Sequence, residues 1–201
     1  MSAPRPVINR PVPPPEVLAS LAGLDPVHAR LFAMRGVTDP AQLDYGLAGL
    51  APIGLLENVD AAVDLLQAKR NEKITVVGDF DVDGATSTAL LLRCLKAFGF
   101  ADVDYLVPNR FEYGYGLTPE IVAVAAQRKP GLIITVDNGI SSVAGVAAAT
   151  KAGIPVLVTD HHLPGEEIPD AAVIVNPNLP GSRFPSRNLA CLLYTSDAAD
   201  E

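Results

Sequence analysis

Five short apolar runs between residues 74 and 175 constrain the fold of this chain more than any other feature. Each run is rich in Val, Ile and Leu without a clean apolar–polar alternation, which is typical of parallel strands buried on both faces. The runs cover residues 74–77, 103–107, 132–136, 156–158 and 172–175. Helical segments are predicted between them at residues 85–98, 119–128 and 141–152. This alternation predicts an α/β domain over residues 73–190, built on a doubly wound, mainly parallel five-stranded sheet.

The first 72 residues have a different pattern. Residues 1–15 contain six prolines and are expected to form an extended Pro-rich tail, because proline does not fit the interior of regular elements. An N-terminal helical extension is expected over residues 16–72. Its helices are predicted at residues 16–22, 26–35, 40–45 and 58–70. The pairs Asp25-Pro26 and Asp39-Pro40 support two of these starts, because they have the order of an N-cap and a first helical residue.

Composition and charge exclude some classes and leave others open. The longest apolar runs are far shorter than the ~20 residues that cross a bilayer, and no apolar signal segment follows the N-terminus. Cys94 and Cys191 have no ligand spacing, which favours reduced thiols and a cytoplasmic protein. The net charge of −8 argues at first against a nucleic-acid partner. However, five of the 23 acids lie in the clusters described below, and the remaining 18 acids against 15 bases do not decide the partner.

Aspartates follow three of the predicted strands within two residues of their ends, at Asp79, Asp137 and Asp160. Because parallel strands deliver their carboxyl ends to one edge of a sheet, where ligands bind, we expect these three side chains to converge. The first position is the most acidic, since Asp81 and Asp83 follow Asp79 at alternate positions. Three carboxylates so close together repel one another unless a cation or solvent takes up the charge. The sequence therefore predicts a metal site at this edge.

Two of the three histidines, His161 and His162, directly follow Asp160. A lone histidine such as His28 is more often a satisfied polar group than a ligand, but these two share the sheet edge with the aspartates. A mixed Asp and His set suits Mn²⁺ or Mg²⁺ better than Ca²⁺. Several acids shared between ions predict a two-metal site that activates a water and holds a phosphoryl oxygen. We expect Asp160 to fix the tautomer of a histidine by bonding to the ring nitrogen that does not bind the metal.

Residues 79–84 also match parts of two other motifs. Their Asp-x-Asp-x-Asp-Gly pattern matches the first half of an EF-hand loop, but the glutamate required at position 12 is Leu90 here, so this interpretation fails. An Asp-x-Asp after a strand also resembles haloacid-dehalogenase-like phosphatases. That family has a paired Asp-Asp late in the chain where this chain has Asp-His-His, so it remains a minor alternative.

Three further residues are candidates for phosphate or nucleic-acid binding. Thr86 lies near a predicted helix start that points its N–H groups at the same edge. Arg110 follows the second predicted strand and is able to hold a phosphate bidentately. Tyr115 belongs to a glycine-rich loop on which a base is expected to stack. Each residue taken singly fits an ordinary surface position about as well.

Four motifs, in this order, resemble those of the DHH phosphoesterases. They are Gly-Asp-Phe-Asp-Val-Asp-Gly at 78–84, Val-Asp-Asn-Gly at 136–139, Thr-Asp-His-His at 159–162 and Val-Asn-Pro at 175–177. Pro-Asn-Arg at 108–110, Tyr-Gly-Tyr-Gly-Leu at 113–117 and Leu-Phe-Ala-Met-Arg-Gly-Val at 31–37 are similar to the branch of bacterial single-strand-specific exonucleases. The resemblance spans residues 26–190.

The resemblance implies an Mn²⁺- or Mg²⁺-dependent exonuclease that degrades single-stranded DNA from its 5′ end in repair and recombination. The metal ligands that it implies are Asp79, Asp81, Asp83, Asp137 and His161. Among these, Asp137 bridges the two ions, whereas Asp79 either binds an ion or orients its neighbours. His162 is implied to contact the scissile phosphate or to assist its ligation. The implied catalytic set is Asp81, Asp83, Asp137, His161 and His162.

The chain departs from the family pattern after Ala190, where a glycine-rich turn opening another helix is expected. We expect residues 191–201 to be a non-native or artefactual tail on a truncated domain. Two alternatives therefore stay open. One is a DHH phosphoesterase acting on short oligonucleotides, cyclic dinucleotides or pyrophosphate. The other is an inactive metal-binding fragment.

Overall fold

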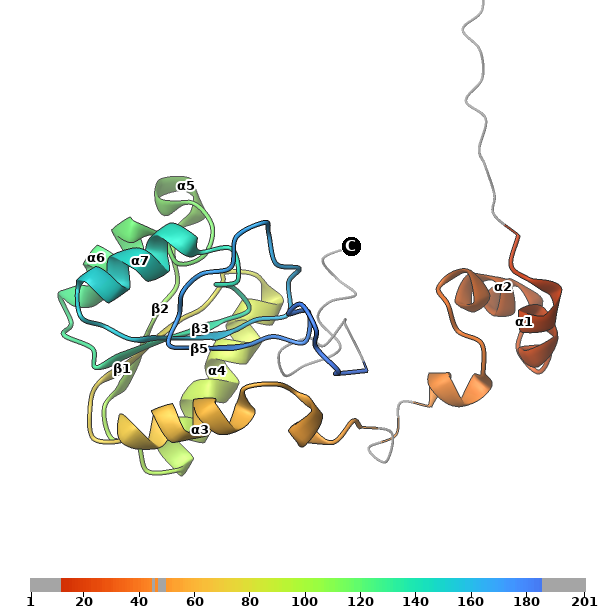
Figure 1. The fold of residues 1–201 in the computed structure, drawn as a ribbon, viewed down its shortest axis with the longest axis horizontal. Coiled ribbons are helices and arrows are strands. Elements are labelled where there is room, and N and C mark those ends of the chain that lie inside the picture. The colour runs from red at the N-terminus through yellow and green to blue at the C-terminus, as the bar shows by residue number, and fades with distance from the viewer. Residues whose placement is uncertain (1–11, 45, 47–49, 186–201) are drawn as a thin grey trace, which may run out of the picture. The chain divides into compact units, whose positions relative to one another are not determined.

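The computed structural model describes residues 12–44, 46 and 50–185 (Figure 1). The predicted tail at 1–15 falls largely outside these residues, and the predicted tail at 191–201 does so entirely. The chain divides into two compact units, Met1–Leu50 and Ala51–Glu201, which are described separately.

The first unit contains short helices that start at the predicted residue or, for the first helix, one residue before it. They are α1 (Pro15–Ser20), α2 (Pro26–Met34) and the 3₁₀ helix η1 (Pro40–Leu43). The Asp25 carboxylate accepts hydrogen bonds from the N–H groups of Val27 and His28, and Asp39 forms a capping box with Gln42. Both Asp-Pro starts are therefore confirmed, because each aspartate satisfies N–H groups that the first helical turn leaves unpaired.

The second unit is an α/β domain with one five-stranded sheet. Its elements are η3 (Ile53–Leu55), α3 (Val59–Ala68), β1 (Ile74–Val77), α4 (Val82–Ala97), β2 (Val103–Leu106), α5 (Arg110–Tyr113), α6 (Pro119–Ala126), β3 (Leu132–Val136), α7 (Val143–Lys151), β4 (Val156–Thr159) and β5 (Val173–Val175). The strands lie in the order β2-β1-β3-β4-β5, and every neighbouring pair is parallel. The predicted doubly wound parallel sheet is confirmed.

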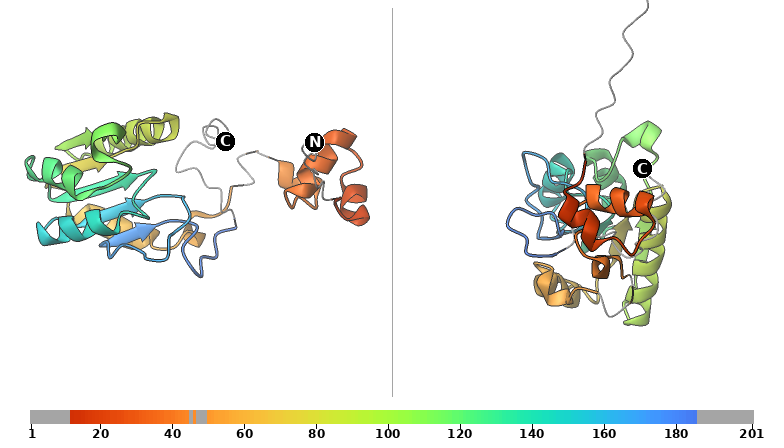
Figure 2. Two further views of the ribbon diagram at one scale, coloured as in Figure 1. Left: turned by 90° about the horizontal axis from the view of Figure 1, so that it is seen from above. Right: turned by 90° about the vertical axis from the view of Figure 1, so that its right-hand side faces the viewer.

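Helices cover both faces of the sheet and create two apolar layers (Figures 1 and 2). On one face, Ile121 of α6 and Val146 of α7 pack with Ile133 and Val158 of the strands. On the other face, Ala62 of α3 and Leu95 of α4 belong to the cluster that contains Ile134. β1 and β3 are buried at every position, whereas β2 and β5 are only partly buried. The expectation that all five strands are buried on both faces is wrong for these two, because each lies at an edge and has a single neighbouring strand.

The boundary between the helical extension and the sheet domain differs from the predicted one. The structure divides the chain after Leu50 and not after residue 72. α3 belongs to the sheet unit, because Ala62 is buried in its core and the Asn58 side-chain amide donates to the Ile174 carbonyl of β5 at 2.7 Å. An amphipathic helix of 10 residues buries its apolar side only against another element, and here that element is the sheet.

α4 begins at Val82, three residues before the predicted start. The Asp81 carboxylate causes this early start, because it accepts a hydrogen bond from the Gly84 N–H at 2.9 Å and caps the helix. As a result, Asp83 lies within the first turn of α4 and not in a loop. Among the residues that the structure describes, no helix has both the length and the apolarity of a membrane span.

Candidate metal centre

The strand order explains why the acidic strand ends meet. In a doubly wound sheet, ligands bind beyond the carboxyl ends of the strands where successive connections leave in opposite directions. Here this switch point lies between the neighbouring strands β1 and β3, because α4 after β1 and α7 after β3 pack on opposite faces. Asp79 follows β1, Asp137 follows β3, and Asp160 follows the next strand, β4. The predicted convergence of these three aspartates is found.

At the end of β1, Asp79 is held by Arg110. Arg110 donates from Nε to Asp79 Oδ1 at 3.2 Å and from a terminal nitrogen to Asp79 Oδ2, so the pairing is bidentate. Asp79 Oδ1 also accepts the Phe80 N–H at 2.7 Å. The Asp79 side chain is almost fully buried, whereas that of Arg110 is 36% exposed. Asp79 therefore already has a cation from the protein itself, which favours its predicted role of orienting neighbours over that of a ligand.

Arg110 lies between two aromatic rings. Its guanidinium carbon is 4.1 Å from the centre of the Phe80 ring and 5.0 Å from that of Tyr115. Burial acts to lower the pKa of Arg110, but the hydrogen bond and charge of Asp79 outweigh this effect and raise it. The Tyr115 hydroxyl donates to the Asp137 carbonyl at 3.3 Å. Burial, followed by the charge of Asp160, raises the pKa of Tyr115 far above its usual range, so the hydroxyl keeps its proton. Arg110 and Tyr115, predicted from separate motifs, thus border the same carboxylates.

Asp81 and Asp83 both lie at the start of α4 but face different partners. Asp81 uses Oδ1 to cap the helix and places Oδ2 3.6 Å from an Arg110 nitrogen. Asp83 is 1% exposed, and its Oδ2 lies 3.6 Å from His161 Nε2. The start of α4 therefore directs Asp81 toward Arg110 at the start of α5 and Asp83 toward the loop after β4.

Asp137 and His161 form the central contact of the site. His161 Nε2 lies 2.9 Å from Asp137 Oδ1. Asp137 is 2% exposed and has a backbone φ of +61°, a conformation that aspartate tolerates better than most residues. Burial raises the pKa of Asp137 to about 6; the His161 hydrogen bond opposes this shift, and the charges of Asp83 and Asp81 add to it. A buried carboxylate with two acidic neighbours is a favourable place for a cation.

Asp160 contacts the ring of the second histidine. Its Oδ1 lies 2.7 Å from His162 Nδ1 and also accepts the backbone N–H groups of both histidines. Its Oδ2 accepts the Ile140 N–H at 2.9 Å. Burial acts to raise the pKa of Asp160, but the hydrogen bonds from His162 and Ile140 prevail and hold it below its usual value. The predicted supporting role of Asp160 is consistent with this geometry, with His162 as the residue that it supports.

Three asparagines complete the surroundings of the site and were not predicted. Asn176 Nδ2 donates to the His162 carbonyl at 3.0 Å, and Asn178 Nδ2 donates to the His161 carbonyl. The turn after β5 therefore holds the loop that carries both histidines. Asn138, next to Asp137, bonds to two strand ends. The Asp-Asn-Gly and Asn-Pro motifs contain Asn138 and Asn176, and Asn178 lies one residue beyond the second motif, but a side-chain amide that binds backbone carbonyls has no distinctive spacing in sequence.

The structure does not support the phosphate-binding role predicted for Thr86. Because α4 begins at Val82, Thr86 lies in the second turn of the helix and away from its terminal N–H groups. Its hydroxyl donates to the Val82 and Asp83 carbonyls at 2.8 and 3.1 Å. The hydroxyl thus takes part in the bonding of the helix itself.

Two groups of side chains have ligand atoms close enough to share an ion. Asp79, Asp81 and Asp137 form one group, and Asp137, His161 and His162 form the other; within each, the ligand atoms lie within 4.8 Å of one another. Carboxylate oxygens, which both groups contain, are donors that suit Mn²⁺ and Mg²⁺. The desolvated Asp137, common to both groups, fits the position between two ions. The residues present therefore fit a two-metal centre.

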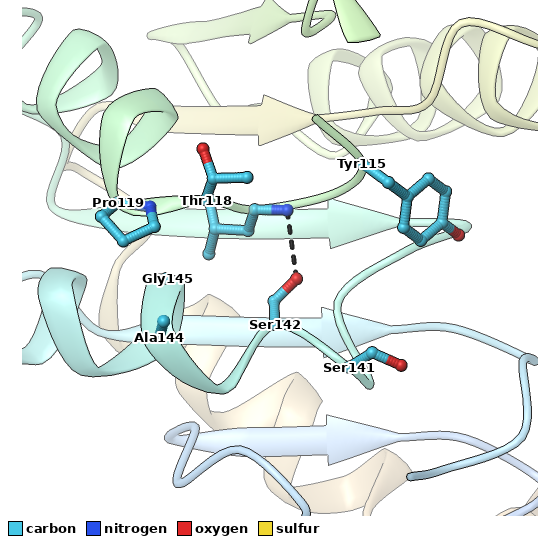
Figure 3. A pocket seen from close by; sticks show the side chains of 8 residues that line it. Tyr115, Thr118, Pro119, Ser141, Ser142, Ala144 and Gly145 are labelled. Atoms are coloured by element: carbon cyan, nitrogen blue, oxygen red, sulfur yellow. Dashed lines mark hydrogen bonds between the residues drawn. The ribbon is translucent and has the colours of Figure 1, made fainter. Parts of the chain in front are cut away.

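A pocket lies beside the carboxylates and not over them. Thr118, Pro119, Ser142 and Gly145 line it at the N-terminal ends of α6 and α7, and the Ser142 hydroxyl accepts the Leu117 N–H at 3.1 Å (Figure 3). Tyr115 borders both this pocket and the metal centre, and it lies beyond the carboxyl ends of the strands in Figure 3.

Comparison with known proteins agrees with this geometry. The chain is 54% identical to the single-stranded-DNA-specific exonuclease RecJ of Salmonella typhimurium over 171 residues, which are 84% of this chain and 30% of the relative. It is 53% identical to the protein of the same name from Escherichia coli over 84% of this chain and 30% of that one. The chain thus spans about a third of the length of these relatives.

Two solved structures share the fold. The crystal structure of RecJ from Thermus thermophilus in complex with Mn²⁺ matches 91% of this chain and 26% of its own, with a TM-score of 0.64 and 32% identity. The crystal structure of an exonuclease RecJ bound to manganese matches 71% of this chain and 37% of its own, with a TM-score of 0.61 and 36% identity.

The family model described as "DHH family, N-terminal domain" matches residues 73–196, which contain the whole sheet and every side chain of the centre. On this match, together with the site that the strand ends assemble, the chain belongs to the DHH family.

Proposed function

We propose that this chain is the N-terminal catalytic portion of a RecJ-type exonuclease, which hydrolyses single-stranded DNA in the 5′→3′ direction with two Mn²⁺ or Mg²⁺ ions. The observation that carries the proposal is the gathering of four candidate ligands at one sheet edge: His161 Nε2 lies 2.9 Å from Asp137 Oδ1 and 3.6 Å from Asp83 Oδ2, and Asp81 shares a ligand group with Asp137. Two ions held in this way supply an activated water and a positive clamp for the phosphoryl oxygens. The names of the relatives and the manganese in the solved RecJ structures support this choice of substrate and ion.

The position of each side chain suggests its role in the proposed reaction. Asp81, Asp83, Asp137 and His161 hold the ions, with Asp137 between them. Asp79 keeps Arg110 near the centre, where its guanidinium is placed to neutralise a phosphate. His162 is about half exposed and its ring is fixed by Asp160, so it is placed to contact the scissile phosphate. Asp160 orients the His162 ring through its contact with Nδ1 and, because its pKa is lowered, stays ionised as a hydrogen-bond acceptor.

Exposed aromatic rings near the centre favour an unpaired strand as the substrate. Phe80 is 55% exposed and Tyr115 is 44% exposed, and both border Arg110. Unpaired bases stack on such rings, whereas bases within a duplex are already stacked on one another. The 5′→3′ direction, the place of the reaction in repair and recombination, and the cytoplasm as its location belong to the same proposal and rest on the resemblance of the four motifs to the family.

The test measures Mn²⁺ binding and nucleotide release with the same preparations. A single-stranded oligonucleotide labelled at its 5′ end is incubated with the chain and Mn²⁺, beside the duplex of the same sequence, a dinucleotide and pyrophosphate. We expect Mn²⁺-dependent release from the single strand, which Asp81→Ala and His161→Ala abolish. Asp102→Ala is the matched control, because Asp102 is an exposed partner of Lys73 outside the metal centre. Undiminished release by Asp81→Ala and His161→Ala would contradict the site, and faster turnover of the dinucleotide or of pyrophosphate would favour another DHH phosphoesterase.

A second candidate function is metal binding without turnover. The observation that favours it is that the chain spans only 30% of the Salmonella and Escherichia relatives, so the activity of those whole proteins does not transfer automatically. Mn²⁺ binding with no release from any of the four substrates is the result expected for this candidate. Appreciable turnover at saturating Mn²⁺ would exclude it.

A further inference from the structure

Asn138 occupies an unusual turn between β3 and α7. It is fully buried, and it stands between two residues with positive φ, Asp137 at +61° and Gly139 at +115°. Gly139 is required there for space as well, since a Cβ at that position would lie 2.4 Å from Thr135 Oγ1. Non-glycine residues with positive φ persist where the surroundings hold them in place. The contacts of Asn138 show what holds this turn.

The Asn138 side-chain amide joins the ends of two neighbouring strands. Nδ2 donates to the Val77 carbonyl at 3.1 Å and to the Val136 carbonyl at 2.8 Å. Val77 is the last residue of β1, and Val136 is the last residue of β3. Both partners are acceptors, so the orientation of the amide is unambiguous. The two hydrogen bonds continue the linkage of β1 to β3 just where the regular ladder ends at the switch point.

The oxygen of the same amide, Oδ1, helps to explain why an asparagine occupies this position. Asn138 Oδ1 is buried and accepts no hydrogen bond from the part of the chain that the structure describes. An unpaired buried acceptor is unfavourable, and an apolar side chain of similar size would avoid it. An asparagine at this position is therefore explained by its donor group and not by packing alone.

The bridged carbonyls directly precede the carboxylates of the site. Asp137 is the residue after Val136, and Asp79 is the second residue after Val77. On its far side, the β1 turn packs tightly on α4, because a Cβ on Gly78 would lie 2.0 Å from Thr88 Oγ1. The β1 turn is thus held by α4 on one side and linked by Asn138 to the β3 turn on the other.

We propose that Asn138 is a positioning residue that sets the separation between the acidic strand ends of β1 and β3, and through it the separation of the two metal positions. This inference rests on the two-metal site of the proposed function. Ligand distances in a metal site are held within about 0.2 Å, so a small opening between the two turns is enough to weaken binding. Asn138 itself contacts backbone carbonyls, and its effect on the ions is indirect.

The experiment measures Mn²⁺ affinity and stoichiometry by titration calorimetry, together with the electron paramagnetic resonance spectrum of the bound manganese. Asn138→Asp keeps the shape of the side chain but turns an oxygen toward two carbonyl oxygens. Asn138→Ala removes the bridge without adding a charge, and it replaces the first variant if that one does not fold. Thr75→Val is the matched control, because it removes a part-buried hydrogen bond of 2.6 Å between Thr75 Oγ1 and Asp104, away from the carboxyl end of β1.

We expect both Asn138 variants to lose roughly 10- to 100-fold in Mn²⁺ affinity, the range found when a partner behind a metal ligand is removed, and to lose the spectrum of a coupled manganese pair. Thr75→Val is expected to keep both, even where its melting temperature falls as far as theirs. Wild-type affinity and spectrum in a folded Asn138 variant would overturn the inference and leave the proposed function intact. An equal loss in Thr75→Val would also overturn it, and a wild-type chain that binds no Mn²⁺ would overturn both proposals.

Discussion

Buried carboxylates follow both β1 and β3, but in the part of the chain that the structure describes only the one after β1 is paired with a permanently cationic side chain. Asp79 after β1 is paired bidentately with Arg110, so the chain supplies its cation. Asp137 after β3 faces His161 and two further acids, and burial raises its pKa to about 6. A buried carboxylate with its own counter-ion contributes to the folded state, whereas one without a permanent counter-ion is a cost until a cation arrives. Asp79 therefore stabilises the structure of the site through Arg110, whereas Asp137 is available to bind a metal ion.

The largest effect on Mn²⁺ affinity is expected for Asp137→Asn, which changes the carboxylate that has no permanently cationic side chain as its partner among the described residues. Because Asp137 belongs to both ligand groups, its loss is expected to lower Mn²⁺ affinity by more than the roughly 100-fold that removal of an outer partner costs. Without metal, the same variant is expected to be more stable than the wild type, since a desolvated charge is removed. Denaturation with and without Mn²⁺ checks both signs. A variant that is less stable under both conditions would break the comparison.

Asp79→Asn tests the other half and is expected to have a smaller effect. It leaves Arg110 without its main partner, and the free energy of unfolding is expected to fall by about 1–2 kcal/mol with or without Mn²⁺, as for the loss of a partly exposed charged hydrogen bond. Chemical denaturation measures this change. Arg110→Lys, which keeps the charge but not the bidentate geometry, is the control and should lose less. A loss of Mn²⁺ affinity as large as that of Asp137→Asn would instead identify Asp79 as a ligand.

The pH dependence of stability sharpens the comparison. The pKa of Asp137 is raised from 3.8 in the ordinary state to about 6 in the folded protein. The folded state therefore holds the proton more tightly, and the contribution of Asp137 to stability is lost as the pH rises from about 4 to about 6. In a metal-free buffer, the stability advantage of Asp137→Asn should grow over this range and then level off. Unfolding curves at several pH values measure it, and an advantage that does not change with pH would count against the assignment.

The smallest effect is expected for Thr86→Val. The Thr86 hydroxyl bonds to carbonyls within α4, so its removal is expected to change nucleotide release and Mn²⁺ affinity by less than about twofold, as for a surface helix residue outside the site. Steady-state assays on the single strand check this. A large rise in KM would restore the phosphate-binding role that the sequence predicted for it.

The fold could be predicted from the sequence because buried parallel strands leave a direct signature. The runs at Ile74–Val77 and Leu132–Val136 correspond to β1 and β3 residue for residue. The site residues could be named because acids recur at strand ends. The start of α4 lies three residues before the predicted one, because Asp81 is a helix cap as well as a candidate metal ligand. The pairing of Asp79 with Arg110 and the bridge made by Asn138 could not be predicted, because both depend on the order β2-β1-β3, which the runs alone do not specify.

The link between α3 and β5 has a consequence for how the domain folds. Asn58 and Ile174 are 116 residues apart, so their hydrogen bond closes most of the sheet unit into one loop. Closures over long stretches of chain are slow, because much of the chain must already be ordered before they form. β5 is also the strand that precedes Asn176 and Asn178, which hold the histidine loop. We therefore expect the loop with His161 and His162 to reach its final shape late, once β5 has been synthesised and has paired with α3.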